Sequence, residues 1–192
     1  VVTPFIRQEW KSCGRKVLTA LTSSILSSSH SLAASLRRAI ISALGAVAKV
    51  VSADVLTDIC LQLTHKYNTL ARDDLEMSAM VGSCIQQIVS RVGDAISSTE
   101  VWKQLLLCTY MGCFDPDKEA QEVWFECFNQ ALNHSGTGTK LAAIRRMLAD
   151  VCDAATSRMK ELSWKRRLQG LAVLKDVLQN VPAAVLCNVE EE

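Results

Sequence analysis

The chain has 192 residues, of which 49% are hydrophobic but only 5% aromatic, and its formal net charge is +1. This length allows one sizeable core or about four or five helical repeats. The near-neutral charge argues against a protein devoted to nucleic-acid binding, because phosphate recognition needs concentrated positive charge. Leu, Val, Ile and Ala carry most of the apolar surface, which is typical of helix–helix packing.

Eight cysteines are spread along the chain without any C-x-x-C spacing. Most of them occupy apolar positions of predicted helices, where a free cysteine behaves as a small hydrophobic residue. We therefore expect free thiols, no disulfide framework, and a reducing compartment, namely cytoplasm and nucleus. The eight are Cys13, Cys60, Cys84, Cys108, Cys113, Cys127, Cys152 and Cys187.

Helical periodicity predicts eight helices, and no segment alternates at period two for long enough to predict a strand. The fold class is therefore predicted to be all-α. Residues 1–12 are expected to be the end of a preceding helix, with a terminus at Gly14. The predicted helices are 15–26, 35–51, 53–70, 74–96, 100–112, 116–133, 140–162 and 163–179.

The uncharged segment 17–36 has the length of a membrane span, but it contains seven Ser and two Thr. Two helices joined by a serine-rich turn around Ser27–Ser29 fit this composition better, so we expect no membrane span. Pro116 is expected at the first position of the sixth helix, where its missing N–H costs nothing. The clearest loop is 133–139, which contains two glycines.

Several predicted helices carry one apolar stripe each. The last helix has Ser163 as a candidate N-cap and an apolar stripe of five large residues, Trp164, Leu168, Leu171, Leu174 and Leu178. The inward residues expected elsewhere are Leu36, Ile40, Ala43, Val47 and Val50 in the second helix; Leu56, Ile59, Cys60, Leu63, Tyr67 and Leu70 in the third; Met77, Val81, Cys84, Ile85, Ile88 and Val92 in the fourth; and Ala120, Val123, Trp124, Cys127, Phe128 and Ala131 in the sixth.

The helices pair in chain order, and the second members of the pairs recur at a regular period. Aligning Ala39, Ala79, Ala120 and Leu168 gives steps of 40, 41 and 48 residues. HEAT and armadillo repeats have periods of about 40–47 residues. The sequence thus predicts an α-solenoid of about four HEAT/armadillo-like pairs in one segment, 1–192, because stacked pairs cover each other's apolar surface. A closed helical bundle is the alternative, and the lack of polar end faces predicts an excerpt of a longer solenoid.

The three histidines give no metal-site spacing, since His-x-x-x-His, Glu-x-x-His and Cys-x-x-Cys are all missing from the sequence. Cys127 and His134 are close in sequence, but Cys127 falls on the apolar stripe of its helix. Segment 135–140 has the composition of a phosphate loop without its spacing or a preceding strand. We expect no enzyme activity, no metal and no cofactor.

Three basic clusters stand out, and the two on second helices of the pairs are candidates for docking an acidic partner protein, because second helices are expected to share a face. Solvated helix edges are the alternative reading of such clusters. The docking candidates are Arg37, Arg38, Lys165, Arg166 and Arg167, with Arg145-Arg146 as the third cluster.

Residues 123–174 carry a series of short motifs in a fixed order: Val123-Trp124, a Gly136-Thr137 loop, Leu141, Ile144 and Leu148, and then Ser163-Trp164-Lys165, Gln169-Gly170 and Ala172. This order resembles the C-terminal part of the giant HEAT-repeat proteasome adaptor and scaffold proteins of the extracellular-mutant-29 type, although Leu171 and Val173-Leu174 replace a more Ala-rich run. The resemblance implies a large cytosolic and nuclear solenoid that bridges proteasome particles and has no catalytic residues.

The function predicted on this basis is a non-catalytic protein-binding scaffold or adaptor, associated with the proteasome. The first alternative is a HEAT-repeat segment of another assembly, such as a nuclear transport receptor or a chromosome-associated protein. An enzyme, either a helical hydrolase or a metal protein, is the second alternative. Expected partners are proteins and not nucleic acid, and the oligomeric state is left open.

Overall fold

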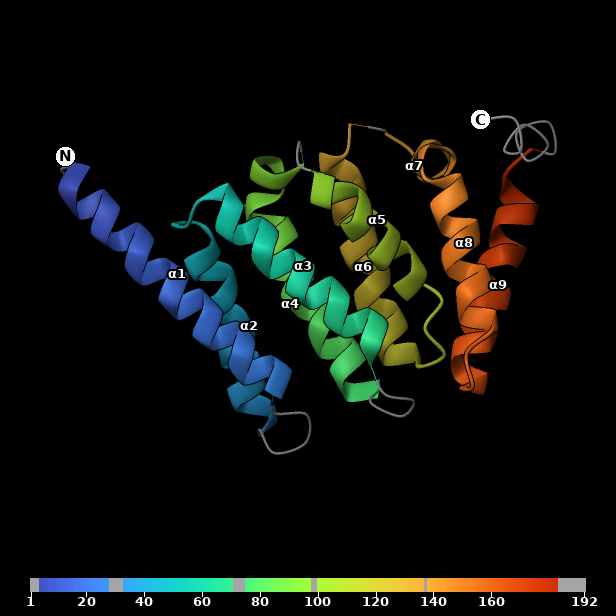
Figure 1. The fold of residues 1–192 in the computed structure, drawn as a ribbon, viewed down its shortest axis with the longest axis horizontal. Coiled ribbons are helices and arrows are strands. Elements are labelled where there is room, and N and C mark those ends of the chain that lie inside the picture. The colour runs from blue at the N-terminus through green and yellow to red at the C-terminus, as the bar shows by residue number, and fades with distance from the viewer. Residues whose placement is uncertain (1–3, 28–32, 71–74, 98–99, 137, 183–192) are drawn as a thin grey trace.

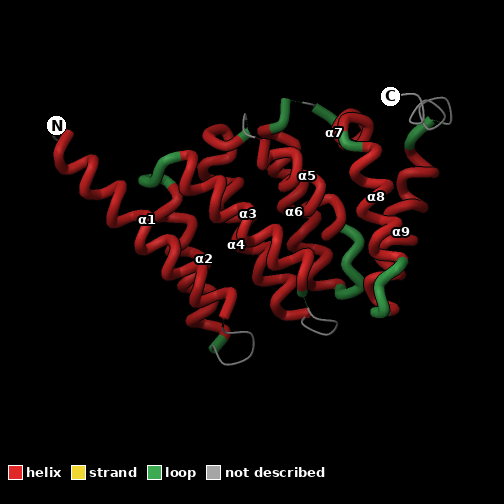
Figure 2. Tube along the Cα trace, in the orientation of Figure 1, coloured by secondary structure: helices red, strands yellow, loops and turns green. Residues whose placement is uncertain are grey.

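The computed structural model of the chain describes residues 4–27, 33–70, 75–97, 100–136 and 138–182, and it describes their side chains from Ser12 onward except that of Leu75. This part of the chain is all-helical and has no strand, which confirms the predicted all-α class (Figure 2). The helices are α1 (Pro4–Ser27), α2 (Ala34–Ala48), α3 (Ala53–Thr69), α4 (Leu75–Ile96), α5 (Glu100–Gly112), α6 (Lys118–His134), α7 (Lys140–Arg146), α8 (Leu148–Met159) and α9 (Trp164–Asn180).

The helices lie side by side in chain order, with α1 at one end of the molecule and α9 at the other (Figure 1). Contacts join α1 to α2, α3 to α4, α5 to α6, and α8 to α9. Neighbouring pairs meet through α2, α4 and α6 in one row and through α1, α3, α5 and α8 in the other. Each pair thus packs against the pair beside it.

Three predicted helix boundaries are wrong. The chain continues as one helix through Gly14, where a Cβ would lie 2.9 Å from Val51 Cγ1, so this glycine permits close packing and not a terminus. Helix α6 begins at Lys118 and not at Pro116. Its N-cap is Asp117, whose carboxylate accepts a hydrogen bond from the Ala120 N–H at 2.9 Å.

The third wrong boundary is inside 140–162, which was predicted to be one helix. The chain breaks at Met147, which has φ −122° and ψ 24°, and this break separates α7 from α8. Ile144, Met147 and Leu148 are all buried, so apolar residues on both sides of the break reach the core. Neither Gly nor Pro marks this position in the sequence.

The core is centred on α3, α4, α5 and α6, where most of the predicted inward residues are buried. Trp124 on α6 is fully buried and fits between glycines of two other helices. A Cβ on Gly82 of α4 would lie 3.0 Å from Val123 and 3.1 Å from Trp124, and one on Gly112 of α5 would collide with the indole ring. The indole N–H donates to the Ser78 hydroxyl at 3.2 Å, and that hydroxyl donates to the Asp115 carboxylate at 2.7 Å.

The inward faces of two helices differ from the prediction. In α2 the buried residues are Leu44, Gly45 and Ala48. The predicted Ile40 and Val47 are partly buried against the core, whereas Leu36 and, just after the helix, Val50 are exposed. The error is larger in α9, where the buried residues are Gln169, Gly170, Val173 and Val177. Of the predicted stripe, Trp164, Leu168, Leu171 and Leu178 lie on the opposite, exposed side, whereas Leu174 is partly buried against the core. Ser163 stands at the N-cap position without a side-chain cap hydrogen bond.

Gly170 explains part of this orientation, because it allows α9 to approach α8 closely. A Cβ at Gly170 would lie 2.5 Å from the backbone oxygen of Ala155 and 3.0 Å from Met159 Cγ. A larger residue here would push the two helices apart, since a backbone oxygen cannot move independently of its helix.

Within the described residues, no helix is both long enough and apolar enough to span a bilayer. The described cysteines, Cys13, Cys60, Cys84, Cys108, Cys113, Cys127 and Cys152, are free thiols. Burial raises the pKa of Cys60, Cys84 and Cys108 to about 12 each.

Replacing Gly170 with Ala is expected to destabilise the protein by about 1–2 kcal/mol, because the cost of overpacking exceeds the gain in helix propensity of about 1 kcal/mol. Urea unfolding followed by circular dichroism measures this change. Gln179→Ala, at an exposed position of the same helix, is the control and should change stability by less than about 0.5 kcal/mol. Equal stability of the two variants would contradict the close α8–α9 contact.

Raising the pH above 9 is expected to destabilise the fold, because an unfolded thiol has a pKa of 9.0 whereas buried Cys84 has one of about 12. Between these values the unfolded state binds fewer protons than the folded state, so each such thiol removes up to about 1.4 kcal/mol per pH unit. Urea unfolding under reducing conditions from pH 8 to 11 tests this effect. Cys84→Ala should show a shallower decline than the wild type, and parallel curves would exclude the proposed contribution of this thiol.

Candidate functional site

The placement of α9 depends on a buried amide that reaches two other helices. Gln169 is 1% exposed. Its Nε2 donates to the Tyr67 hydroxyl at 2.6 Å and to the Met111 carbonyl oxygen at 2.8 Å. A buried amide left without partners would cost about 1–3 kcal/mol, so these bonds hold α9 at one rotation against α3 and α5.

Two guanidinium groups add to this anchor at the end of α3. Arg166 Cζ lies 5.3 Å and Arg158 Cζ 5.6 Å from the centre of the Tyr67 ring. Arg166 Nη2 donates to the Tyr67 carbonyl oxygen at 2.8 Å, and Arg158 Nη2 donates to Asn68 Oδ1 at 2.9 Å. Burial lowers the pKa of Arg166, with a further contribution from the nearby Arg158 charge, and burial raises the pKa of Tyr67.

The anchored rotation leaves a band of large apolar residues on the outer side of α9 and on the turn before it. We call this band the α9 stripe. Arg167 and Lys175 are exposed on the same helix, and Lys165 Nζ lies 6.0 Å from the Trp164 ring centre. The stripe comprises Leu162, 79% exposed, Trp164, 61%, Leu168, 47%, Leu171, 52%, and Leu178, 69%.

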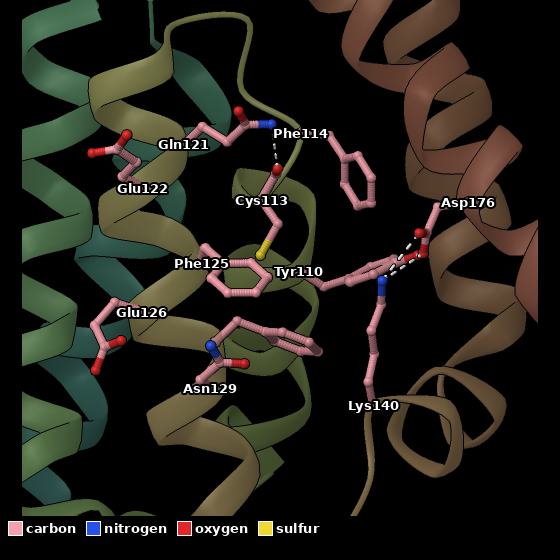
Figure 3. Close-up of a pocket in the computed structure, with 11 residues that line it drawn as sticks. Tyr110, Cys113, Phe114, Gln121, Glu122, Phe125, Glu126, Asn129, Lys140 and Asp176 are labelled. Atoms are coloured by element: carbon pink, nitrogen blue, oxygen red, sulfur yellow. Dashed lines mark hydrogen bonds and ion pairs between the residues drawn. The ribbon is translucent and has the colours of Figure 1, made fainter.

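A groove of about 570 Å³ opens between α5 and α6 on one side and α9 with the start of α7 on the other (Figure 3). We call it the α6–α9 groove. Its inner wall is aromatic: the Tyr110 ring meets the rings of Phe114 at 5.3 Å and Phe128 at 5.5 Å. Phe125 stands on the α6 rim and is 56% exposed. The groove is lined by Tyr110, Cys113, Phe114, Gln121, Glu122, Phe125, Glu126, Phe128, Asn129, Lys140 and Asp176.

One wall of the groove is closed by a hydrogen-bonded ion pair. The Tyr110 hydroxyl donates to Asp176 Oδ2 at 2.7 Å, and Lys140 Nζ lies 3.0 Å from both carboxylate oxygens (Figure 3). The ammonium group also lies 5.7 Å from the Tyr110 ring centre. Burial, together with the hydrogen bond and charge of Asp176, raises the pKa of Tyr110. Tyr110 therefore stays protonated and donates to Asp176.

The opposite rim of the groove is acidic. Glu122 and Glu126 lie one turn apart on α6, and both are exposed. Deeper in the groove, Gln121 Nε2 donates to the Cys113 carbonyl oxygen at 2.9 Å. Burial raises the pKa of the Cys113 thiol to about 12, so this thiol is not a reactive thiolate at neutral pH.

The structure separates the basic residues predicted to dock a partner. Arg37 and Arg38 are on α2, near the opposite end of the helix row from α9 (Figure 1). Arg37 forms an ion pair with Glu76, and Arg38 is exposed. Arg166 is half-buried, because its guanidinium group donates to the Tyr67 carbonyl oxygen. Arg167 is exposed and Lys165 is half-buried over Trp164, which leaves the predicted docking role of this cluster a prediction.

The residues weighed for catalysis or metal binding lie apart from the groove. His134 Nδ1 lies 2.7 Å from Asp94 Oδ1, and Cys127 is buried with its pKa raised by that burial. Gly136 and Gly138 adopt positive φ values of 65° and 69°, as the loop predicted around them requires. His30 lies outside the described residues, and among the described ones no group of three or more His, Cys, Asp or Glu could hold a metal ion.

The sequence analysis did not predict the groove, although a clustering of aromatic residues in the sequence indicates it. Five of the ten aromatic residues fall between Tyr110 and Phe128 in a chain that is only 5% aromatic. Phe125 also lies outside the apolar stripe of its helix, so its ring is expected to be exposed. An apolar stripe on the last helix was predicted from the sequence, but the exposure of its side chains was not.

No protein-family model, curated protein or solved structure matches the chain. The candidate site therefore rests on the geometry of the two surfaces described above, the α9 stripe and the α6–α9 groove.

Replacing Tyr110 with Phe is expected to destabilise the protein by about 1–3 kcal/mol. The charged Asp176 carboxylate then loses the hydrogen bond that the buried Tyr110 hydroxyl donates to it. Lys140→Gln removes the charged partner of Asp176, which also accepts a hydrogen bond from Asn180 Nδ2 at 3.1 Å. The Lys140 ammonium is 44% exposed, so its ion pair should contribute less than about 1 kcal/mol. Urea unfolding of both variants measures the difference. A larger loss from Lys140→Gln than from Tyr110→Phe would contradict the assigned importance of the hydroxyl.

Proposed function

We propose that the protein is a non-enzymatic scaffold of HEAT-type helix pairs that binds other proteins. The observation that carries this proposal is the α9 stripe, which presents large apolar side chains at one end of the helix row. Several large apolar side chains exposed along one side of a helix point to an interaction site, because exposing them to water is unfavourable.

The arrangement of the helix pairs supports the same proposal. Each pair packs against the pair beside it, and α9 is the last described helix of the row. In repeat proteins, stability comes from interfaces between adjacent pairs, so an apolar outer side of a pair is a surface that another helix can cover. We therefore assign the α9 stripe to a partner helix packed along α9.

We further propose that the scaffold is associated with the proteasome and acts in cytoplasm and nucleus. The support for this narrower proposal is the resemblance of residues 123–174 to the proteasome adaptor and scaffold family. Two residues of the resembling motifs, Gln169 and Gly170, set the position of α9 through their contacts with Tyr67 and Ala155. The motif thus coincides with the residues that orient the stripe.

The test is affinity purification of the tagged full chain from cells of its source organism, with proteasome subunits quantified by mass spectrometry. Leu171→Asp places a charge in the middle of the α9 stripe. It should lower recovery by about tenfold or more, because burying one leucine contributes about 1.5–3 kcal/mol. Leu36→Asp is the matched control, since Leu36 is 48% exposed on the distant α2 and should leave recovery unchanged.

The outcomes separate the two levels of the proposal. If the wild type recovers a different complex and Leu171→Asp does not, the proposed association with the proteasome is rejected and the proposed scaffold function is retained. An identical set of proteins from the wild type and Leu171→Asp would reject binding through the α9 stripe.

A further inference from the structure

The α6–α9 groove is a second surface, and none of the residues of the α9 stripe lines it. Helix α9 packs against α8 and forms hydrogen bonds to α3 through Gln169 and to α5 through Asp176. The contacts that position α9 are therefore made with helices other than α6. The space left between Phe125 on α6 and Asp176 on α9 is the groove (Figure 3). Its volume of about 570 Å³ is in the range of about 300–1,000 Å³ that is typical of ligand sites.

The walls of the groove suit an apolar or aromatic group. Tyr110 and Phe128 are almost fully buried and support the inner wall from behind, whereas Phe114 is partly exposed and Phe125 presents more than half of its surface to solvent. Aromatic rings arranged around an open space can accept another ring or an aliphatic side chain by edge and face contacts. An isolated exposed phenylalanine is ordinary, but one at the mouth of an aromatic groove can cover a bound side chain.

The charges around the groove are unbalanced. Three carboxylates, Glu122, Glu126 and Asp176, line it together with the single ammonium of Lys140, which leaves a net charge of −2. Lys140 and Asp176 are paired with each other. The negative charge therefore resides on the α6 rim, where Figure 3 shows Glu122 and Glu126 on the side of the helix away from Asp176. The whole chain has a net charge of +1, so this rim is a local acidic surface on a nearly neutral protein.

A ligand that uses both features needs an apolar group for the inner wall and a positive charge for the rim. A peptide supplies both on one backbone, and an arginine can also stack on Phe125 while it pairs with a carboxylate. We propose that the α6–α9 groove binds a segment of a partner protein in which an apolar or aromatic anchor residue is flanked by arginine or lysine. This partner differs in charge from the acidic one predicted for the basic clusters.

The test uses two synthetic peptides with the same leucine and phenylalanine anchors, one flanked by arginines and the other by glutamates. Binding to the full chain is measured by isothermal titration calorimetry near physiological ionic strength. The arginine peptide should bind, and the glutamate peptide should bind about tenfold more weakly or not at all. Raising the ionic strength to about 0.5 M should weaken binding of the arginine peptide several-fold.

Variants then assign the binding to the groove. Glu122→Lys with Glu126→Lys should weaken binding of the arginine peptide by about tenfold or more, since two attractive pairs become repulsive. Asp58→Lys with Asp153→Lys makes the same change in net charge at exposed positions of α3 and α8 outside the groove lining, and it should have an effect below about twofold. Phe125→Ala should weaken binding by about tenfold through lost apolar contact. Circular dichroism verifies that each variant folds.

The proposal is overturned if the arginine peptide does not bind, if the glutamate peptide binds as tightly, or if the Glu122 and Glu126 reversal leaves its affinity unchanged. Leu171→Asp keeps this experiment separate from the scaffold proposal. It should disrupt the α9 stripe and leave binding of the arginine peptide as in the wild type, so each proposal can fail alone.

Discussion

The hydrogen bonds of Gln169 are the constraint on which the C-terminal part of the molecule depends. The side chain is buried and bonds to Tyr67 on α3 and Met111 on α5. Turning α9 to bury its leucines would withdraw this amide and the Arg166 guanidinium from their partners. The hydrophobic gain of burying the leucines would then be set against several buried polar groups without hydrogen bonds, each costing about 1–3 kcal/mol. The polar anchor thus opposes the usual preference of an amphipathic helix to bury its large apolar residues.

Both candidate surfaces follow from this one rotation. With Gln169, Gly170 and Val173 inward, Trp164, Leu168, Leu171 and Leu178 of α9 face outward in the α9 stripe. The same rotation directs Asp176 toward Tyr110 and Lys140, which closes one wall of the α6–α9 groove. A helix rotated to bury its leucines would present neither surface. The stripe and the groove are therefore linked in origin, although they offer different chemistry to a partner.

Local periodicity was sufficient for the helices of the core. In α3, α4 and α6 the apolar residues recur at helical spacing and face a continuous core, so the buried sides could be predicted from Leu63, Cys84 or Phe128 and their neighbours. The orientation of α9 could not, because the partners of Gln169 are 102 and 58 positions away in the chain. The break at Met147 also lacked a local signal, since no Gly or Pro stands there. In the groove, the aromatic residues were visible in the sequence, but the pairing of Lys140 with Asp176 across 36 positions was not.

The tryptophans of the described part are unevenly placed, and this has an optical consequence. Trp124 and Trp102 are buried, whereas Trp164 is 61% exposed at the start of α9, within the surface assigned to a partner helix. Indole emission shifts to longer wavelength in water, so Trp164 is the ring whose fluorescence should report solvent access on α9. The molecule therefore carries an intrinsic reporter of occupancy at that surface, without any attached dye.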